Sequence, residues 1–247
     1  MRKIIYIILS TTLFIFSCKQ RNTPDAATIV NKSIEVSGGH LFDNLTIEFD
    51  FRDKHYKAIR NNGKFQYERV FSDSLGIIKD VLYNKGFQRY INEIPVEVSD
   101  NKSKEYSSSV NSVHYFSVLP YGLNAPAVNK FYLGNVDVKG ENYHKLKVTF
   151  NEKGGGEDFD DVFVYWIHTE TNKVEYLAYS YSEEDGIGFR FREAYNERNI
   201  NTLRFVDYNN YKPKTKNVTL ENLDNLFEKG DLDFLSKIVL ENVTVTF

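Results

Sequence analysis

The feature of this sequence that most constrains its fold is a series of alternating apolar and polar residues between His144 and Tyr211. Runs with a period of two, bounded by Gly, Asn or Asp, are typical of antiparallel strands joined in hairpins. We predict a meander with a turn at Asn196–Asn199 before its last strand. Its strands are Lys145–Asn151, Val162–His168, Val174–Tyr181, Ile187–Glu193 and Leu203–Tyr208.

The rest of the chain extends this sheet and adds helices. Further strands are predicted at Leu45–Phe51, His55–Arg60, Phe65–Phe71, Ile77–Tyr83, Phe87–Ile91, Phe131–Val138 and Val243–Phe247. Helices are predicted at Ala26–Ser37, at about Asn101–Leu119 and at Leu220–Phe227, the first capped by Asp25 and stopped by Gly38-Gly39. We therefore expect a mainly β (α+β) fold. A single curved antiparallel sheet of about 10–12 strands would form a half-open barrel packed against two or three helices.

The first seventeen residues have the layout of a secretory signal peptide. Arg2 and Lys3 precede the apolar run Ile4–Phe16, which is followed by Ser17 and Cys18. A helix of that length rises only about 20 Å, which is short for a hydrocarbon core of about 30 Å. We interpret residues 1–17 as a signal peptide and residues 25–247 as a single β-rich domain.

Ile15-Phe16-Ser17-Cys18 resembles the lipobox of bacterial lipoproteins. The resemblance implies that Cys18 is diacylated and becomes the new N-terminus, with residues 18–24 as a lipidated tether. The alternative is an ordinary secreted protein with an incidental cysteine. Cys18 is the only cysteine, so no disulfide can form within the chain. The basic stretch Lys19-Gln20-Arg21 lacks the acidic signal for surface export, so we expect a periplasm-facing lipoprotein of the cell envelope.

The net charge and the composition of the mature chain exclude some classes of binding partner. Without Arg2 and Lys3, 29 of the 31 basic residues remain against 34 acidic ones, a net charge of −5. This balance argues against nucleic acid and against electrostatic adhesion to anionic lipid, so membrane attachment is expected through the acyl chains alone. The 17 Tyr and 19 Phe favour strands with an apolar cavity or an exposed aromatic face. We expect a monomer without a cofactor.

The order of the predicted elements resembles that of the lipoprotein carriers LolA and LolB over about residues 25–211. Shared features are a tether, an amphipathic helix ending in Gly-Gly, successive hairpins, a central helix and further strands. The resemblance implies an antiparallel sheet curled around a hydrophobic cavity that takes up acyl chains. It assigns no individual residue of this chain to the carriers' cavity entrance.

Three strings look like a family of uncharacterised Gram-negative lipoproteins, and the match covers most of the mature chain. They are SVHYFSVLPYGL (112–123), GGGEDFDDVFVYW (154–166) and GFRFREAYNER (188–198). Some members of this family carry the label deoxyribose-phosphate aldolase. A Schiff-base aldolase needs eight strand–helix alternations and a desolvated lysine, whereas this chain has hairpins and places Lys79 on the solvent side of a strand. We therefore do not carry the label over, and we leave enzymatic activity open.

Arginines form the polar cluster with the best prospect of a function. Arg190, Arg192 and Arg204 lie on adjacent predicted strands. With Glu193 and Asp207 they would form a cross-strand charge ladder. The alternative is that the guanidinium groups bind the carboxylate or phosphate of a ligand head group.

Two other clusters give weaker signals. The acidic residues Glu157, Asp158, Asp160 and Asp161 lack the spacing of an EF-hand loop, and we predict no metal site. The five histidines show no zinc-binding spacing. His114 and His168 could, with Tyr121, line one end of a cavity, but we favour the alternative that the histidines are hydrogen-bonded within the fold or face solvent.

Aromatic residues give the central strands two apolar faces. One face holds Phe163, Tyr165, Ile167, Leu177, Tyr179 and Tyr181, and the other holds Val162, Val164 and Trp166. Either a ligand cavity or a filled core explains this pattern. The candidate ligand-binding residues are Phe163, Tyr165, Trp166, Leu177, Tyr179, Tyr181, Arg190, Arg192 and Arg204.

Three hypotheses follow. The first is an envelope lipoprotein that binds a lipid or acyl chain in the cavity of a curved sheet, which requires a pocket of several hundred Å³ lined by Tyr, Phe and Leu. The second is a structural or partner-binding lipoprotein with a filled core and an exposed aromatic patch. The third and last in rank is an enzyme acting on a small anionic substrate, for which the sequence shows no catalytic residue.

Overall fold

The computed structural model describes residues 24–155, 159–183 and 186–247, whose strands form two antiparallel sheets of seven strands each. The first sheet contains β1 (Asn44–Phe51), β2 (Lys54–Asn61), β3 (Lys64–Asp73), β4 (Gly76–Tyr83), β5 (Gly86–Ile91), β6 (Ile94–Val96) and β14 (Glu241–Thr246). Its order is β14-β1-β2-β3-β4-β5-β6, so the last strand of the chain pairs with the first.

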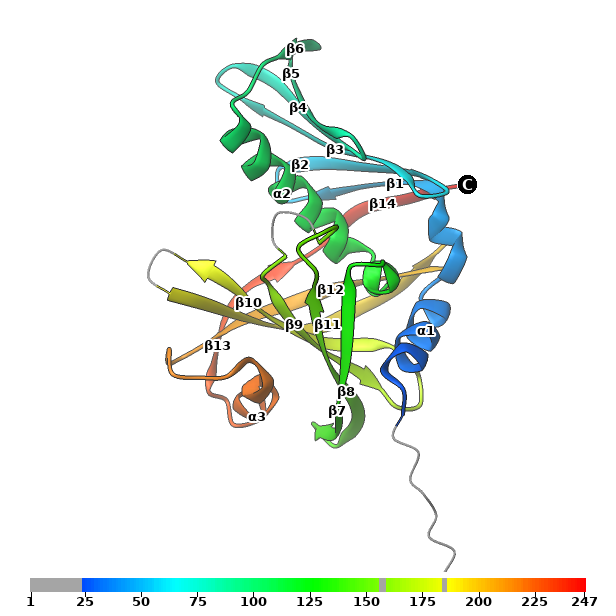
Figure 1. Cartoon of the computed structure of the whole chain (residues 1–247), viewed down its shortest axis with the longest axis vertical. Coiled ribbons are helices and arrows are strands. Elements are labelled where there is room, and N and C mark those ends of the chain that lie inside the picture. Colours follow the sequence, from blue (N-terminus) through cyan, green and yellow to red (C-terminus); the bar gives the residue numbers. More distant parts are fainter. Residues whose placement is uncertain (1–23, 156–158, 184–185) are drawn as a thin grey trace, which may run out of the picture.

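The second sheet contains β7 (Val128–Val138), β8 (Glu141–Phe150), β9 (Val162–His168), β10 (Val174–Glu183), β11 (Gly186–Ile200), β12 (Leu203–Pro213) and β13 (Leu232–Ile238). Its strands are paired in chain order, from β7 at one edge to β13 at the other. This sheet is the predicted meander, extended by one strand at each end. The chain then crosses from β13 in the second sheet to β14 in the first (Figure 1).

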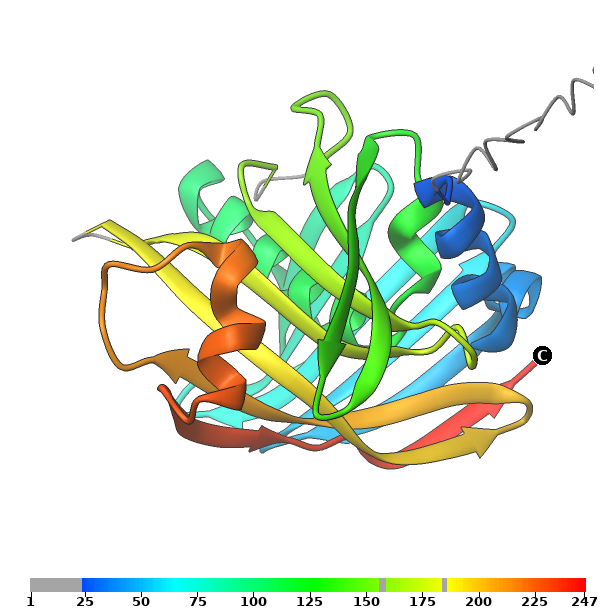
Figure 2. The same cartoon turned by 90° about the horizontal axis from the view of Figure 1, so that it is seen from below.

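The helices separate and cover these sheets. They are α1 (Ala26–Val36), α2 (Asp100–Ser117) and α3 (Leu223–Glu228), with 3-10 turns η1 (Gly39–Asp43), η2 (Tyr121–Asn124) and η3 (Leu220–Asn222). Helix α2 lies between the sheets and packs on β3, β4 and β5 (Figure 1). Figure 2 shows α3 lying across the face of the second sheet that points away from α2. Helix α1 lies at the end of the second sheet that is distant from α3. No helix within the described ranges has the length and apolar character needed to cross a membrane.

Helix α1 begins and ends as the sequence predicts. The Asp25 carboxylate accepts hydrogen bonds from the backbone N–H groups of Ala27 and Thr28, at 3.4 and 3.1 Å. The helix stops before Gly38, whose φ is 131°. A Cβ atom at Gly38 would lie 2.4 Å from a methyl carbon of Leu203 on β12, so only glycine allows this close approach.

Three clusters of buried side chains make up the core. One packs α1 on the inner face of the second sheet, and it contains Ile29, Val30, Leu146, Tyr165 and Ile167. Another joins the two sheets, with Ile47 and Phe49 of the first packed on Leu203 and Phe205 of the second. The last lies under η3 and α3 on the outer face of the second sheet, around Trp166 and Phe191.

The predicted mainly β class with covering helices is confirmed, but the strands are divided differently. The sequence predicted one curved sheet of about 10–12 strands, whereas the described residues form two sheets with 14. Residues 97–127, which include α2, separate β6 from β7, so no hairpin joins these two edge strands. The short strand β6 and the strand β13 were not predicted.

The turn predicted at Asn196–Asn199 is wrong. Strand β11 continues to Ile200, and its pairing with β12 shifts between Tyr195 and Arg198, as in a β-bulge. Asn196 has a φ of 51° in this bulge without reversing the chain. The reversal lies at Asn201 and Thr202, where φ is 47° and 70°.

Candidate functional site

The inner face of the second sheet forms one wall of the candidate site. In the register of β9 and β10, Phe163 lies opposite Tyr179 and Tyr165 lies opposite Leu177, so these four side chains share a face. The rings of Phe163 and Tyr179 stack, with centroids 5.4 Å apart and an interplanar angle of 23°. The alternation of the two strands therefore builds a continuous aromatic wall.

Between this wall, α2 and the first sheet lies a cavity of about 1160 Å³. Its aromatic lining comes from all three parts of the fold. The first sheet provides Phe65, Tyr67 and Phe87, helix α2 provides Tyr115 and Phe116, and the second sheet provides Phe150, Phe163, Tyr179, Tyr181 and Tyr208. Serines of α2, among them Ser107 and Ser112, add a polar strip. A cavity of this size and lining is suited to a ligand that is mostly apolar.

The tyrosine hydroxyl groups in and behind the cavity lining are buried, and two of them share a hydrogen bond. The Oη atoms of Tyr115 on α2 and Tyr165 on β9 lie 2.9 Å apart and share a hydrogen bond. Burial raises the pKa of Tyr115, Tyr165 and Tyr208 above the usual value for a phenol. These groups therefore stay neutral, and the wall provides hydrogen bonds without negative charge.

Arg192 is the buried charged residue of the cavity lining, which also includes Arg52, Lys104, Asp160 and Asp161 at more exposed positions. It lies on β11 beside the aromatic wall and is only 7% exposed. Its Cζ lies 3.8 Å from the ring centroid of Phe116 on α2, and its Nη2 donates to Tyr179 Oη at 3.0 Å. Burial lowers the pKa of Arg192, because the charged guanidinium loses its water. An arginine remains protonated in spite of this, so the cavity contains a buried positive charge.

The predicted site residues lie in three different surroundings. Phe163, Tyr179, Tyr181 and Arg192 line the cavity. Tyr165 and Leu177 belong to the fully buried layer of the same wall. Trp166 points to the opposite face, where its Nε1 donates to Asp224 Oδ2 of α3 at 3.0 Å, because neighbouring residues of a strand alternate in direction. The predicted lipidation site Cys18, the signal peptide and residues 18–23 of the tether lie outside the described residues.

The structure gives the three arginines separate partners. The Nη1 of Arg190 donates to the carbonyl of Phe189, and its Cζ lies 4.9 Å from the ring centroid of Tyr181. Arg204 is buried and pairs with Glu197, with Nε and Oε2 2.9 Å apart. The carboxylates expected in the ladder pair elsewhere, Glu193 with Lys139 and Asp207 with Arg198. The ladder as predicted is wrong, because the bulge in β11 changes which side chains meet across β12.

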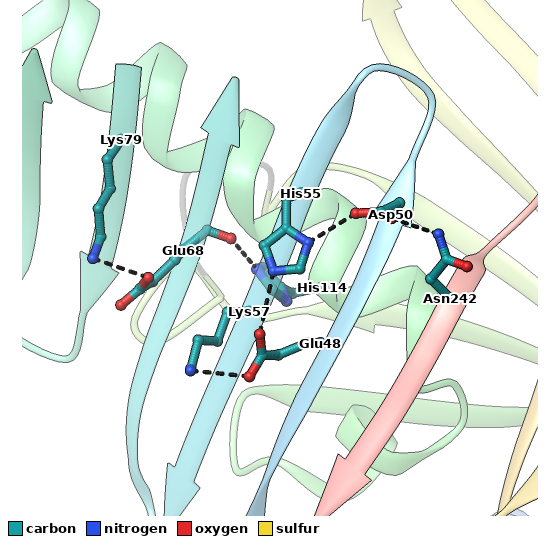
Figure 3. Close-up of polar contacts among 8 residues, drawn as sticks. All are labelled: Glu48, Asp50, His55, Lys57, Glu68, Lys79, His114 and Asn242. Atoms are coloured by element: carbon teal, nitrogen blue, oxygen red, sulfur yellow. Dashed lines mark hydrogen bonds and ion pairs between the residues drawn. The ribbon is translucent and has the colours of Figure 1, made fainter. Parts of the chain in front are cut away.

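The candidate histidines and Tyr121 lie outside the cavity lining, whereas part of the acidic loop belongs to it. Figure 3 shows His114 behind the first sheet, with its Nε2 donating to the carbonyl oxygen of Glu68 at 3.1 Å. His168 lies beside Glu141 at the end of β9, and Tyr121 donates to Asp43. These three side chains therefore do not gather at one end of the cavity. In the acidic loop, Glu157 and Asp158 lie outside the described residues, and Asp160 and Asp161 belong to the cavity lining.

Lys79 lies on the outer face of the first sheet, as predicted. Its side chain is 40% exposed, and its Nζ lies 3.1 Å from Glu68 Oε2 (Figure 3). Lys57, Glu48, His55 and Asp50 make similar cross-strand contacts on this face. The face is therefore polar, and Lys79 lacks the desolvated surroundings that a Schiff-base lysine requires.

Sequence reasoning missed the half of the lining that comes from α2 and the first sheet. Phe65 and Tyr67 alternate on β3, and Tyr115 and Phe116 follow each other on α2. The alternation of Phe65, Tyr67 and Phe71 was a signal for a second aromatic face. No local pattern indicated that this face would lie opposite the meander.

The fold and the cavity together define a two-sheet antiparallel protein with an aromatic cavity beneath a central helix. The family model described as a family of unknown function (DUF6503) matches residues 2–241, and the chain belongs to this family. A comparison with curated proteins gives no match.

Several solved structures are similar to this chain. A LolA superfamily protein from Nitrosomonas europaea is 11% identical, with 91% of this chain and 93% of that chain covered and a TM-score of 0.49. A DUF1329 family protein from Desulfovibrio piger is 10% identical, with 90% and 93% covered and a TM-score of 0.44. The Mycobacterium tuberculosis lipoprotein LppX is 10% identical, with 63% and 87% covered and a TM-score of 0.29. The LolA-like resemblance predicted from the order of elements is thus found among them.

Proposed function

We propose that this protein binds a lipid or a similar apolar ligand between its two sheets. The observation that carries the proposal is the cavity of about 1160 Å³, whose aromatic walls come from α2 and from both sheets. An acyl chain that enters this space leaves water for an apolar surface, which is favourable by about 0.8 kcal/mol for each buried CH₂ group. The cavity exceeds the roughly 300–1,000 Å³ typical of ligand sites, so a long chain has room.

The proposal includes attachment of the protein to a membrane of the cell envelope. A signal peptide over residues 1–17 would be removed, and acyl chains on Cys18 would anchor the mature chain in the membrane. The folded domain would lie on the side of that membrane that faces the periplasm. The tether would end close to α1, which begins at Ala26. Labelling of cells with a radioactive fatty acid tests this step, with Cys18→Ala as the control. Label that persists in Cys18→Ala would rule out lipidation at this residue.

Ligand binding is tested by native mass spectrometry of the gently extracted protein and by displacement of a fluorescent fatty acid. Ser112 lines the cavity on α2, so the indole of Ser112→Trp would occupy ligand space. We expect Ser112→Trp to weaken binding at least tenfold. Glu105→Trp places the same side chain on an exposed part of α2 outside the cavity lining, and it should bind normally. Wild-type protein that binds no lipid in either assay would favour a partner-binding lipoprotein instead.

A further inference from the structure

We propose that the ligand of this cavity is an amphiphile with a small anionic head, of the kind found in a long-chain fatty acid, and that Arg192 binds its carboxylate. The inference rests on the proposed lipid-binding function and adds to it the chemical class of the head group and the residue that selects it. It also gives the ligand an orientation, with the head at β11 and the acyl chain along the aromatic wall.

The position of Arg192 is fixed from three sides. In the sheet register it lies opposite Leu177 on β10 and opposite Asn210 on β12. On the side of α2, the ring of Phe116 covers the guanidinium, with its centroid 3.8 Å from Cζ. The ring centroid of Tyr179 lies 5.1 Å from the same atom. The side chain is thus held in the cavity wall between a helix and a sheet, instead of extending into solvent.

The hydrogen bonds of Arg192 are incomplete. Its Nη2 donates to Tyr179 Oη, whereas its Nε and Nη1 are buried and have no acceptor within the part of the chain that the structure describes. No carboxylate among those residues forms an ion pair with it. A buried charge without a counter-ion is costly, and an anion that accepts hydrogen bonds from these N–H groups would remove the cost.

Two other buried arginines, Arg69 and Arg204, show the usual solution, an ion pair with a carboxylate. Arg60 is also buried, but it lies over the rings of Tyr67 and Tyr121 and forms no ion pair among the described residues. Arg69 and Arg89 share the carboxylate of Asp80, with N–O distances of 2.7 Å to each. Arg204 has Glu197. Arg192 is buried to a similar extent and faces the cavity, but none of the described carboxylates, including Asp160 and Asp161 of the cavity lining, forms an ion pair with it. The missing partner is therefore expected to come from a ligand.

The surroundings of Arg192 favour a compact head group. The guanidinium is 7% exposed and lies among aromatic side chains, so a head with a bulky polar substituent would have to bury that substituent as well. A carboxylate is small, planar and matched to the hydrogen-bond geometry of a guanidinium. Asn210 beside it has an Oδ1 atom that is also buried without a partner among the described residues, and this atom can accept from water held by the carboxylate.

The test compares palmitate with hexadecanol, which has a chain of the same length and a neutral head. Affinities for both are measured by displacement of a fluorescent fatty acid from the full-length wild type, Arg192→Met and Arg60→Met. Arg60 is a matched control, because it is 6% exposed, stacks on Tyr67 and donates to its hydroxyl, yet does not line this cavity. We expect Arg192→Met to weaken palmitate binding at least tenfold and hexadecanol binding less than twofold. Arg60→Met should keep the wild-type preference for palmitate.

The outcomes separate this inference from the proposed function. Wild-type protein that binds hexadecanol as tightly as palmitate would retain the lipid cavity and overturn the role of Arg192. Wild-type protein that binds neither would remove the lipid cavity itself. An equal loss of both ligands in Arg192→Met would also overturn the head-group role. Arg192→Lys, which keeps the charge, should retain part of the preference for palmitate over hexadecanol. If Arg192→Met does not fold, the affinities of Arg192→Lys for the two ligands test the role of the guanidinium instead. Hexadecyl phosphate as a third ligand distinguishes a phosphate head from a carboxylate, and tighter binding of it than of palmitate would contradict the carboxylate assignment.

Discussion

At the scale of single residues, His114 shows how burial makes stability depend on pH. Its ring is stacked on Tyr67 and enclosed by Phe49 and Tyr56, and Figure 3 shows its hydrogen bond to the Glu68 carbonyl. Burial, with a smaller effect from the charge of Arg60, lowers the pKa of His114 to about 3. The unfolded chain takes up a proton near pH 6.5, so it binds more protons than the folded chain between about pH 6.5 and 3.

We therefore predict that the free energy of unfolding decreases as the pH falls below about 6.5, the pKa of His114 in the unfolded chain. Above that pH, neutral His114 makes its whole contribution to stability. The expected slope is about 1.4 kcal/mol of unfolding free energy per pH unit below pH 6. Urea unfolding at several pH values measures it. His114→Gln, which can still donate to the Glu68 carbonyl, should show a slope smaller by this amount. His40→Gln, at an exposed position, serves as the control. Equal slopes in His114→Gln and wild type would show that another group is responsible.

At the scale of elements, a buried ion cluster attaches α2 to the first sheet. Asp80 on β4 is fully buried and pairs with Arg69 on β3 and Arg89 on β5. The two arginines reach the helix, because Arg69 Nη1 donates to Ser109 at 2.6 Å and Arg89 lies 3.6 Å from the ring centroid of Tyr106. The acid thus orients both guanidinium groups under α2.

We predict that Asp80→Asn destabilises the protein by about 3–5 kcal/mol, since it leaves the buried guanidinium of Arg69 and the partly buried one of Arg89 without their counter-ion. Urea unfolding measures the loss. Ligand affinity should fall as well, because α2 carries Tyr115 and Phe116 into the cavity. Glu105→Gln removes the exposed pair with Lys102 on the same helix, and its unfolding free energy should stay close to that of the wild type. A loss in Asp80→Asn no larger than in this control would show that the cluster does not hold the helix.

At the scale of the whole molecule, the end of the chain completes the first sheet. Thr46 of β1 lies opposite Thr246 of β14, and Ile47 lies opposite Val245. Val245 is buried in the cluster that joins the two sheets, and its carbonyl accepts from Asn201 Nδ2 at 2.8 Å. Strand β14 therefore protects the edge of β1 and connects it to the second sheet.

We predict that a chain ending at Leu240 has a melting temperature lower by roughly 10 °C, from the loss of about 3 kcal/mol of burial and strand pairing. It should also aggregate on warming, because β1 would present an unpaired edge. Calorimetry and light scattering measure the two effects. A chain that lacks only Phe247, which is 63% exposed, should behave as the wild type. Unchanged melting of the shorter chain would show that β14 adds little to the fold.

The sequence by itself determined much of the local structure of this protein, although not the position of the turn between β11 and β12. Alternation along Val162–His168 defined strand β9, Asp25 and Gly38 defined the ends of α1, and Asn62-Gly63 defined a hairpin turn, where φ is 47° and 82°. Such features depend on neighbouring residues, whose backbone preferences and side-chain spacing are written in the sequence. The aromatic face of β9 and β10 was predicted for the same reason, but the pattern did not decide between a cavity wall and a filled core.

The tertiary structure alone decided how the strands divide into two sheets, what encloses the cavity and which charges remain without partners. Thr46 and Thr246 pair across almost the whole chain, and no local signal selects one edge strand over another. The same alternation fits both faces of a sheet, so only packing placed Trp166 under α3 and Phe163 in the cavity. Arg192 and Arg204 look alike in the sequence, but Arg204 meets Glu197 and Arg192 meets an open space. Long-range packing sets the surroundings of each side chain, and those surroundings set its chemistry.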